Sequence, residues 1–326
     1  MKVLLTGANG FVGSFLAAAL LQKGYDVYCF VRSTSNLRWI ADLDLNFIYG
    51  SLLDKKSIKT AIKDKNYIFH LAGITKTNNA EDYNTGNYTA TKNLIDMVIE
   101  EKIKLKRFLF TSSQAAIGPS DTLAPIDETK TARPLTYYGE SKLKAQQYIE
   151  KHFDKVPSTI VIPSAVYGPR DKDVLEFFKT VKMGIIPQLQ GRDKYASMIH
   201  VEDLCSAIIA AAESDNTKGQ SYFLANPRPY AWDEISRIAL DFFGKRAIHV
   251  PIPLPVVKSI AFITEIFSKV SGKANIISRQ KVIEMQQDFW ICSPAKAKKD
   301  FGWQAQIELE QGIKETLAWY VSKNWL

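Results

Sequence analysis

Cysteine is scarce in this sequence, and long apolar runs are missing. The 326 residues include three cysteines, Cys29, Cys205 and Cys292. Because their number is odd and their spacing matches no metal motif, we expect neither a disulfide framework nor a metal site. So few cysteines are typical of a reducing compartment, and we expect a cytoplasmic protein. No apolar run is long enough to span a membrane, and we expect no secretory signal, because Met1 and Lys2 lead directly into a strand.

Acidic residues are outnumbered by basic ones. The chain has 42 lysines and arginines against 34 aspartates and glutamates, which gives a net charge of +8 at pH 7. Such an excess indicates either a generally basic surface or attraction to an anionic cofactor or a membrane surface. The sequence has no arginine-rich run and no nucleic-acid-binding motif, so we expect no nucleic-acid partner. The length allows one large α/β domain with an attached lobe, or two domains.

Three glycines follow the first apolar segment, within residues 6–13, and precede a predicted helix over Phe11–Gln22. Gly7 permits a tight turn, Gly10 lets the backbone approach a diphosphate, and Gly13 lets the helix pack closely against the strand. The N-terminus of a helix attracts anions through its free N–H groups and its dipole. This arrangement predicts a cradle for the phosphates of a dinucleotide.

Short apolar segments alternate with helical patterns over about the first 160 residues. This alternation predicts an α/β fold, a Rossmann-type doubly wound parallel sheet, with a smaller, mainly helical C-terminal substrate lobe. We expect the NAD(P)-binding Rossmann core over residues 1–166, with 198–226 returning to it, and mainly the substrate-binding lobe over 167–326. After the first strand, the predicted strands cover residues 26–31, 47–49, 67–73, 107–111, 159–162 and 221–225.

The end of the second predicted strand carries Val31 and Arg32. In a dinucleotide-binding sheet an acidic residue at this point accepts the ribose 2′-hydroxyl of NAD, whereas an arginine pairs with the 2′-phosphate of NADP. Arg32 therefore favours NADP over NAD. The alternative is that Arg32 is a solvated side chain at a strand end, which leaves NAD equally suitable.

Tyr138 and Lys142 lie four residues apart in a predicted helix over residues 136–151, which places them on one helix face. A nearby ammonium favours the phenolate, so we expect Lys142 to lower the pKa of Tyr138 from about 10. A tyrosine tuned in this way exchanges a proton with a carbonyl or alcohol oxygen. The same spacing is common in helices that have no catalytic role, so further groups are needed to identify a site.

Three consecutive hydroxyl residues, Thr111, Ser112 and Ser113, follow the predicted strand over residues 107–111. A hydroxyl at the end of this strand is placed to hydrogen-bond the substrate oxygen that Tyr138 protonates, and to stabilise charge that develops on it. The residues alone leave open which of the three does so.

Together, these segments resemble the extended short-chain dehydrogenases/reductases, the superfamily of NAD-dependent epimerases and dehydratases. The similarity covers nearly the whole chain. The matching segments are TGxxGxxG at residues 6–13, the HxAA-like residues 70–73, Asn87, SSxxxxG at 112–118, YGxSK at 138–142, VYGP at 166–169 and HVED at 200–203.

The resemblance implies a Rossmann core, a C-terminal substrate lobe and a homodimer. Counting back from Gly118 selects Ser113 as the catalytic hydroxyl, beside Tyr138 and Lys142. It also implies substrate contacts, which we assign to Thr75, Ser113, Gln114 and Tyr167. The cofactor contacts that it implies are Gly7, Asn9, Gly10, Phe11, Val12, Gly13, Arg32, Ser51, Leu52, Leu71, Ala72, Gly73, Asn87, Thr111, Ser112, Tyr138, Lys142, Pro163 and Val166.

Three departures from the family pattern bear on the cofactor and the substrate. Val31 stands where NAD-preferring epimerases usually have aspartate, and Ser51 replaces the family's third-strand aspartate, which contacts adenine. Ala196 stands where nucleotide-sugar enzymes usually have an arginine that helps to hold the diphosphate. Arg192 or Lys194 would have to replace that arginine from a different position. Without such a clamp a sugar diphosphate is poorly held.

We therefore favour a reductase or alcohol dehydrogenase with a fairly apolar substrate, in the branch of dihydroflavonol reductase and 3β-hydroxysteroid dehydrogenase. The alternatives are a nucleotide-sugar epimerase or dehydratase that uses NAD and a UDP- or dTDP-sugar, and a non-enzymatic dinucleotide sensor. The apolar residues 254–270 predict a helix that covers the substrate cleft, or alternatively a peripheral membrane patch.

Overall fold

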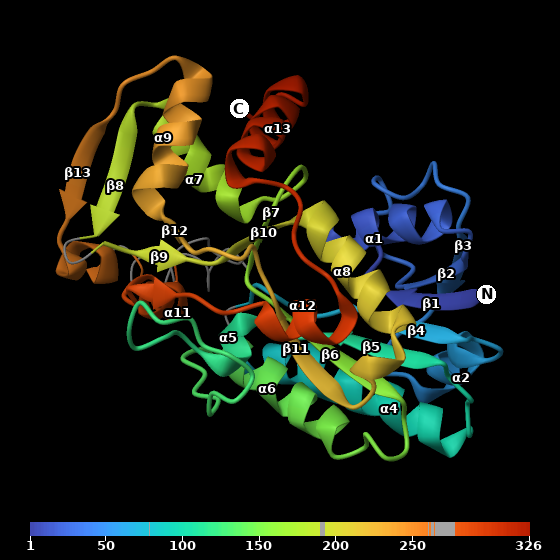
Figure 1. Cartoon of the computed structure of the whole chain (residues 1–326). Coiled ribbons are helices and arrows are strands. Elements are labelled where there is room, and N and C mark those ends of the chain that lie inside the picture. Colours follow the sequence, from blue (N-terminus) through green and yellow to red (C-terminus); the bar gives the residue numbers. More distant parts are fainter. Residues whose placement is uncertain (78, 190–192, 260, 262–263, 265–277) are drawn as a thin grey trace.

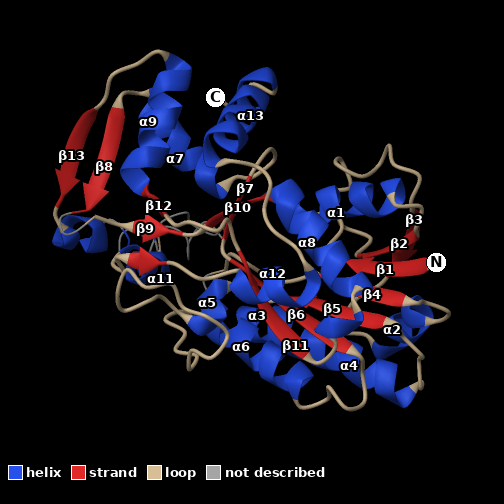
Figure 2. Ribbon diagram, viewed as in Figure 1, coloured by secondary structure: helices blue, strands red, loops and turns tan. Residues whose placement is uncertain are grey.

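A seven-stranded parallel sheet forms the centre of the protein (Figures 1 and 2). The computed structural model describes the chain except for residues 78, 190–192, 260, 262–263 and 265–277. The strand order β11-β6-β5-β4-β1-β2-β3 confirms the predicted α/β fold. The strands are β1 (Lys2–Thr6), β2 (Asp26–Val31), β3 (Asn46–Tyr49), β4 (Tyr67–His70), β5 (Arg107–Thr111), β6 (Ser158–Pro163) and β11 (Gln220–Leu224).

Helices cover both faces of this sheet, which explains why its central strands are mostly apolar and do not alternate between buried and exposed residues. Every residue of β4 and of β6 is buried. One apolar core lies under α1 (Phe11–Gln22) and α8 (Val201–Glu213). A second core lies under α2 (Lys55–Ile62), α4 (Ala90–Glu100) and α6 (Tyr137–Glu150).

The helical segment that contains Asn87 is irregular. A short α3 (Ala80–Tyr83) continues into a π-helical segment, Asn84–Thr89, and then into α4. Segments of π-helix are rare and are frequent at functional sites. Here the segment carries Asn87, and it places the side chain of Asn87 against the loop after β4.

A third apolar core in the C-terminal part of the chain is formed mainly by α7 (Asp173–Lys182), α9 (Trp232–Phe243) and α13 (Leu309–Ser322). This part also contains α11 (Arg279–Met285) and α12 (Ala295–Phe301), and α12 packs on the first core through Ala297. The short α5 (Gln114–Ile117) follows β5. Three small sheets interrupt them: β10 (Met198–His200) with β7 (Ala165–Tyr167), β12 (Tyr230–Ala231) with β9 (Tyr195–Ala196) and β14 (Phe289–Trp290), and β13 (Ile248–Ile252) with β8 (Ile185–Leu189).

The helix predicted over residues 254–270 falls largely outside the described residues. Residues 254–259 of it are helical. In the described part of the chain, no helix is both long enough and apolar enough to cross a bilayer.

An aromatic cluster joins the C-terminus to the loop between β2 and β3. The ring of Trp39 in this loop lies 5.7 Å from that of Trp319 in α13 and 6.4 Å from that of Trp325. The guanidinium groups of Arg38 and Arg170 lie 4.3 Å and 5.0 Å from the Trp39 ring centroid. Stacking and cation–π contacts therefore hold a loop of the sheet against the last helix.

Candidate active site

The glycine segment folds as a tight connection from β1 to α1. Gly7 has a φ of 78°, and a Cβ atom on it would lie 2.7 Å from the backbone nitrogen of Ala72. A Cβ atom on Gly13 would lie 2.0 Å from the carbonyl oxygen of Gly7. Side chains at either position would push α1 or β4 away. The first turn of α1 contains no acidic residue, so its positive end remains suited to an anion.

A buried histidine ties the end of β4 to the end of β1. His70 Nδ1 lies 2.7 Å from the Thr6 hydroxyl and Nε2 lies 2.8 Å from the Thr91 hydroxyl. Thr91 donates its proton to the carbonyl oxygen of Asn87, so it accepts from Nε2–H, and Nδ1 accepts from Thr6. Thr6 in turn accepts from the backbone N–H of Ala72. Burial lowers the pKa of His70 to about 3, which keeps the ring neutral.

Tyr138 and Lys142 both face the chain that follows β5. Ser113 and Tyr138 share a side-chain hydrogen bond. The ammonium of Lys142 donates to the carbonyl oxygen of Thr111 over 2.5 Å and lies 4.3 Å from the ring centroid of Phe110. The structure thus brings Ser113, Tyr138 and Lys142 together, as their positions on one strand end and one helix face predict.

Gln146, the next residue on the same helix face, distinguishes the two serines among the three hydroxyl residues that the sequence leaves equivalent. Ser112 donates to Gln146 Oε1 over 3.0 Å and is buried, so its hydroxyl is engaged away from Tyr138. Only Ser113, of these two serines, is bonded to Tyr138. Sequence reasoning missed Gln146, although its spacing of four from Lys142 was a usable signal.

Two further positions of the YGxSK segment hold the helix in place. A Cβ atom on Gly139 would lie 2.3 Å from the carbonyl oxygen of Ala115, so the glycine lets α6 approach α5. Ser141 accepts a hydrogen bond of 2.8 Å from Asn87 Nδ2. Asn87 also bonds both backbone groups of Ile74, through Oδ1 at 2.7 Å and Nδ2 at 3.0 Å. Asn87 therefore positions the loop after β4, and its amide is fully used in doing so.

The pKa of Tyr138 moves opposite to our expectation. Burial raises it to about 12, and the hydrogen bond from Ser113 only partly opposes that change. Burial also lowers the pKa of Lys142 to about 7. Lys142 is buried and Tyr138 is partly buried, and withdrawal from water penalises the ammonium and the phenolate alike. The prediction that Lys142 lowers the pKa of Tyr138 is therefore wrong for the chain by itself.

The remaining predicted cofactor contacts lie at the C-terminal ends of the strands. Arg32 is exposed at the end of β2. Beyond β3, Ser51 accepts a hydrogen bond from the N–H of Leu53, and the carbonyl of Leu52 accepts one from Asn93. Asn9, Phe11 and Val12 lie in the glycine loop and the first turn of α1, Leu71 to Gly73 follow β4, Pro163 ends β6, and Val166 lies in β7.

The predicted substrate contacts are less uniform. Gln114 is buried directly after Ser113, and its Nε2 lacks a hydrogen-bond partner among the described residues. Thr75 is exposed in the loop after β4. Tyr167 is 2% exposed and packs in the lobe core against Gly312, so it lines no surface that a substrate can reach. We therefore omit Tyr167 from the site.

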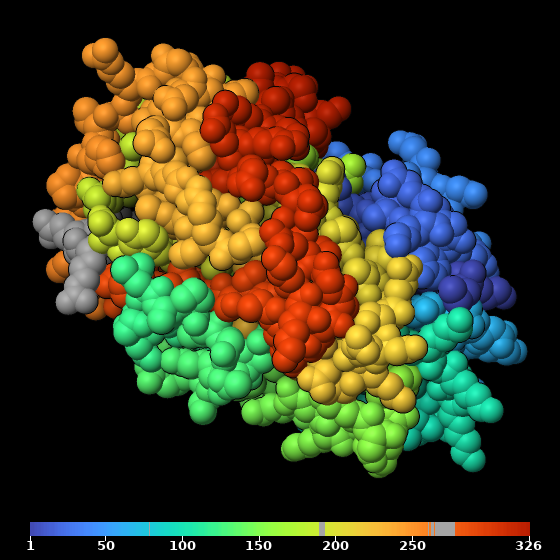
Figure 3. All heavy atoms as spheres, viewed as in Figure 1, coloured from blue at the N-terminus to red at the C-terminus, as the bar shows by residue number. Residues whose placement is uncertain are grey.

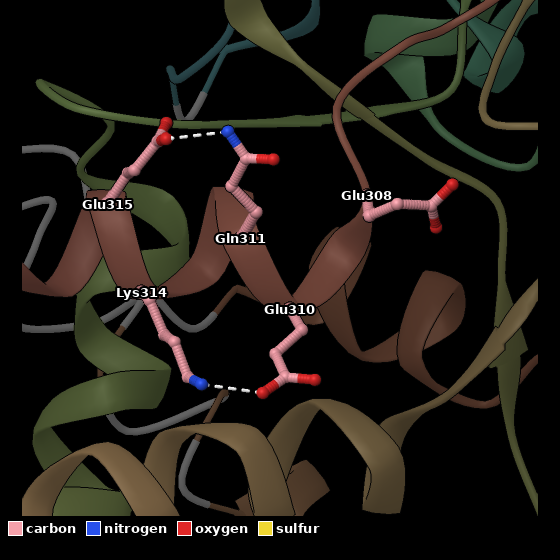
Figure 4. Close-up of a pocket in the computed structure, with 5 residues that line it drawn as sticks. All are labelled: Glu308, Glu310, Gln311, Lys314 and Glu315. Carbon is pink, nitrogen blue, oxygen red and sulfur yellow. Dashed lines mark hydrogen bonds and ion pairs between the residues drawn. The ribbon is translucent and has the colours of Figure 1, made fainter.

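A hollow on the exposed side of α13 has no such convergence of groups (Figure 4). Lys314 pairs with Glu310 at 2.5 Å, and Gln311 donates to Glu315 at 2.9 Å. Both are pairs at a spacing of four on one helix, which stabilise the helix itself. Tyr138, by contrast, lies at the junction of two elements that each supply polar groups.

Comparison with known proteins gives the class. Residues 3–225 match the NAD dependent epimerase/dehydratase family. A ceramide reductase of Caulobacter vibrioides is 26% identical, over 99% of this chain and 96% of the relative. A 3 beta-hydroxysteroid dehydrogenase/Delta 5-->4-isomerase of Mycobacterium tuberculosis is 28% identical, over 98% and 90%. The structure of a UDP-glucose 4-epimerase of Thermotoga maritima has a TM-score of 0.79 at 20% identity, over 99% and 100%.

The chain belongs to the NAD dependent epimerase/dehydratase family, the extended short-chain dehydrogenases/reductases. It is an NAD(P)-dependent oxidoreductase of that type.

Proposed function

We propose that this protein interconverts a carbonyl and an alcohol on a fairly apolar substrate. In the reducing direction, a bound nicotinamide would supply the hydride for the carbonyl carbon, and Tyr138 gives its phenolic proton to the oxygen. Ser113 hydrogen-bonds the same oxygen and stabilises its developing charge. The observation that carries this proposal is the contact of Ser113 with Tyr138, beside Lys142 on the same helix face.

Lys142 contributes to the proposed reaction because it lies beside Tyr138 on the same face of α6. Its ammonium is fixed on the Thr111 carbonyl, one helical turn from the phenol. With a pKa of about 7, Lys142 is close to half protonated near neutral pH. After Tyr138 has given its proton to the substrate, a protonated Lys142 can pass a proton to Tyr138. Lys142 thus replaces the proton that Tyr138 has lost, and it can regain its own proton from solvent.

The residues at the strand ends suit a dinucleotide. The backbone cradle at Gly7 to Gly13 suits a diphosphate, because its three glycines carry no side chain and the first turn of α1 has no acidic residue. We propose NADP as the preferred cofactor, since exposed Arg32 at the end of β2 is free to pair with a 2′-phosphate.

Support for an apolar substrate comes from the missing diphosphate clamp. Ala196 is buried at the position of the usual arginine, and Lys194 is engaged by Asp288 at 3.2 Å and by the carbonyl of Gln287. Arg192 lies outside the described residues. The two curated relatives are named for ceramide and for a steroid, which are both apolar molecules. A nucleotide-sugar epimerase or dehydratase is the alternative.

We further propose that the protein works in the cytoplasm as a homodimer. The three cysteines are buried and free, as suits a reducing compartment. Light scattering in solution measures the oligomeric state directly.

The test compares two adjacent tyrosines. The purified protein is assayed with NADPH and NADH against long-chain ketones and steroid ketones, and separately against UDP- and dTDP-sugars. Tyr138→Phe should lose roughly 100-fold or more in kcat, the scale of a lost general acid. The matched control, Tyr137→Phe, changes an exposed neighbour and should retain activity.

Two results would contradict the proposal. Full activity of Tyr138→Phe would remove the tyrosine from the chemistry. Conversion of a nucleotide sugar without net use of NAD(P)H would establish the epimerase or dehydratase alternative.

A further inference from the structure

One edge of the C-terminal lobe presents apolar side chains to solvent. In the parallel pair β8 and β13, Ile185 lies opposite Ile248 and Pro187 opposite Val250, so these four side chains share one face. Met183 precedes β8 at the same end. Met183 and Ile248 are each 67% exposed and Ile185 is 38% exposed, which is unusual for side chains of this size. We call these five residues the lobe-edge patch.

The patch lies on the side of the molecule opposite the first strands of the sheet. Figure 1 shows β8 and β13 at the outer edge of the lobe, far from β1 to β3, and the space-filling view shows the same edge at the molecular surface (Figure 3). The neighbouring residue Ile186 points the other way and is buried. On that second face Ile186 packs on the lobe, whereas Gln188, His249 and Pro251 are exposed, so the exposed apolar side chains gather on the face of Ile185 and Ile248.

Three basic residues border the patch. Lys182 precedes Met183, and Lys245 donates to the carbonyl oxygen of Lys182 over 2.7 Å. Arg246 lies two residues before Ile248 and is exposed. Within the described part of the chain, none of these three cations forms an ion pair, and the nearby acid in sequence is Asp241. The border is therefore positive, in a protein whose net charge is +8.

Apolar side chains within a positive border fit an anionic bilayer better than a second copy of the chain. A two-fold contact between copies would place the same cations against each other. A bilayer surface instead supplies phosphates for Lys182, Lys245 and Arg246, and an acyl boundary for Met183 and Ile248.

We propose that the lobe-edge patch docks this protein reversibly on bilayers that contain anionic lipid. Ile248, Ile185 and Met183 enter the headgroup region, and Lys182, Lys245 and Arg246 contact lipid phosphates. The surface lies beside, and not within, residues 254–270, where the sequence pattern had suggested a membrane patch. Docking requires no catalytic activity, so it stands or falls independently of the proposed reaction.

The test is co-sedimentation of the full-length protein with vesicles. One set contains phosphatidylcholine alone, and the other contains roughly one third phosphatidylglycerol. The wild type should bind the anionic vesicles and release them as NaCl rises from ~0.1 M to ~0.5 M, because salt screens the cations. Lys182→Gln and Arg246→Gln should each weaken binding roughly five-fold. The double variant Ile185→Ser/Ile248→Ser should remove most of it.

The control variants make the same kinds of substitution at residues outside the lobe-edge patch. Leu123→Ser alters an apolar residue that is 55% exposed outside the patch, and Lys144→Gln alters an exposed lysine on α6. Both should bind vesicles like the wild type. A wild type that does not sediment with anionic vesicles overturns the proposal. So does a double variant that binds as well as the wild type, or one that changes only the oligomeric state.

Discussion

Burial of Lys142 makes a quantitative prediction about stability. The pKa of this lysine is about 7 in the folded chain, against an ordinary value of 10.5. Between these values the unfolded chain binds more protons than the folded chain, so stability rises with pH in this window. The difference corresponds to about 5 kcal/mol of stability that is missing at pH 7 and regained near pH 10.5. The cause is the loss of hydration around a buried ammonium.

Replacing Lys142 by methionine removes this cost and keeps the length of the side chain. The variant also loses the hydrogen bond to the Thr111 carbonyl, which costs about 1 to 3 kcal/mol. We therefore expect Lys142→Met to be more stable than the wild type by about 2 to 4 kcal/mol at pH 7. Its activity should be largely lost, because the variant lacks the amine that returns a proton to Tyr138. Such a trade of stability for function is common at active sites.

The assay is urea unfolding followed by tryptophan fluorescence, at pH 7 and at roughly pH 9.5. The gain of Lys142→Met should shrink as the pH rises, because the wild type regains stability. Lys144→Met, an exposed change two residues along α6, is the control and should show neither effect. A Lys142→Met protein that is less stable at pH 7, or whose gain is equal at both pH values, would refute the reasoning.

Three further changes test the scaffold. Gly13→Ala forces a Cβ atom to within 2.0 Å of the Gly7 carbonyl, and should weaken NADPH binding at least ten-fold in a fluorescence titration; unchanged affinity would contradict this packing. His70→Phe loses two buried hydrogen bonds, and should cost roughly 2 to 4 kcal/mol in chemical unfolding. Because the pKa of His70 is about 3, the wild type also loses stability as pH falls below 6.5, and His70→Phe should lack that share; identical acid profiles would refute it. Trp39→Ala removes the contact with Trp325 and should lower stability by roughly 2 to 4 kcal/mol. Unchanged stability would contradict a stabilising role for the aromatic cluster.

Local patterns in the sequence were sufficient where structure depends on near neighbours. Helix α1 has the predicted bounds, and α6 is flanked by Thr136, whose hydroxyl accepts from the N–H of Gly139 as an N-terminal cap. The apolar runs and the glycine spacing also predict the parallel sheet and the family correctly.

Features that depend on distant contacts could not be predicted. The π-helical segment Asn84–Thr89 is set by the fit of Asn87 between the loop after β4 and Ser141 on α6. The short strand pairs after residue 183 also depend on partners far along the chain, and the expectation of a mainly helical lobe missed them. Single-sequence patterns contain no information on such pairings, because each strand alone is only two to five residues long.

The sequence by itself determined the sheet, the cradle at Gly7 to Gly13 and the alignment of Tyr138 with Lys142, because these follow from periodicity and from close packing. Tertiary structure decided the state of those groups. It assigned Ser112 to Gln146 and left Ser113 for Tyr138. It also reversed the expected pKa shift of Tyr138, because the burial of a side chain is a property of all elements packed around it.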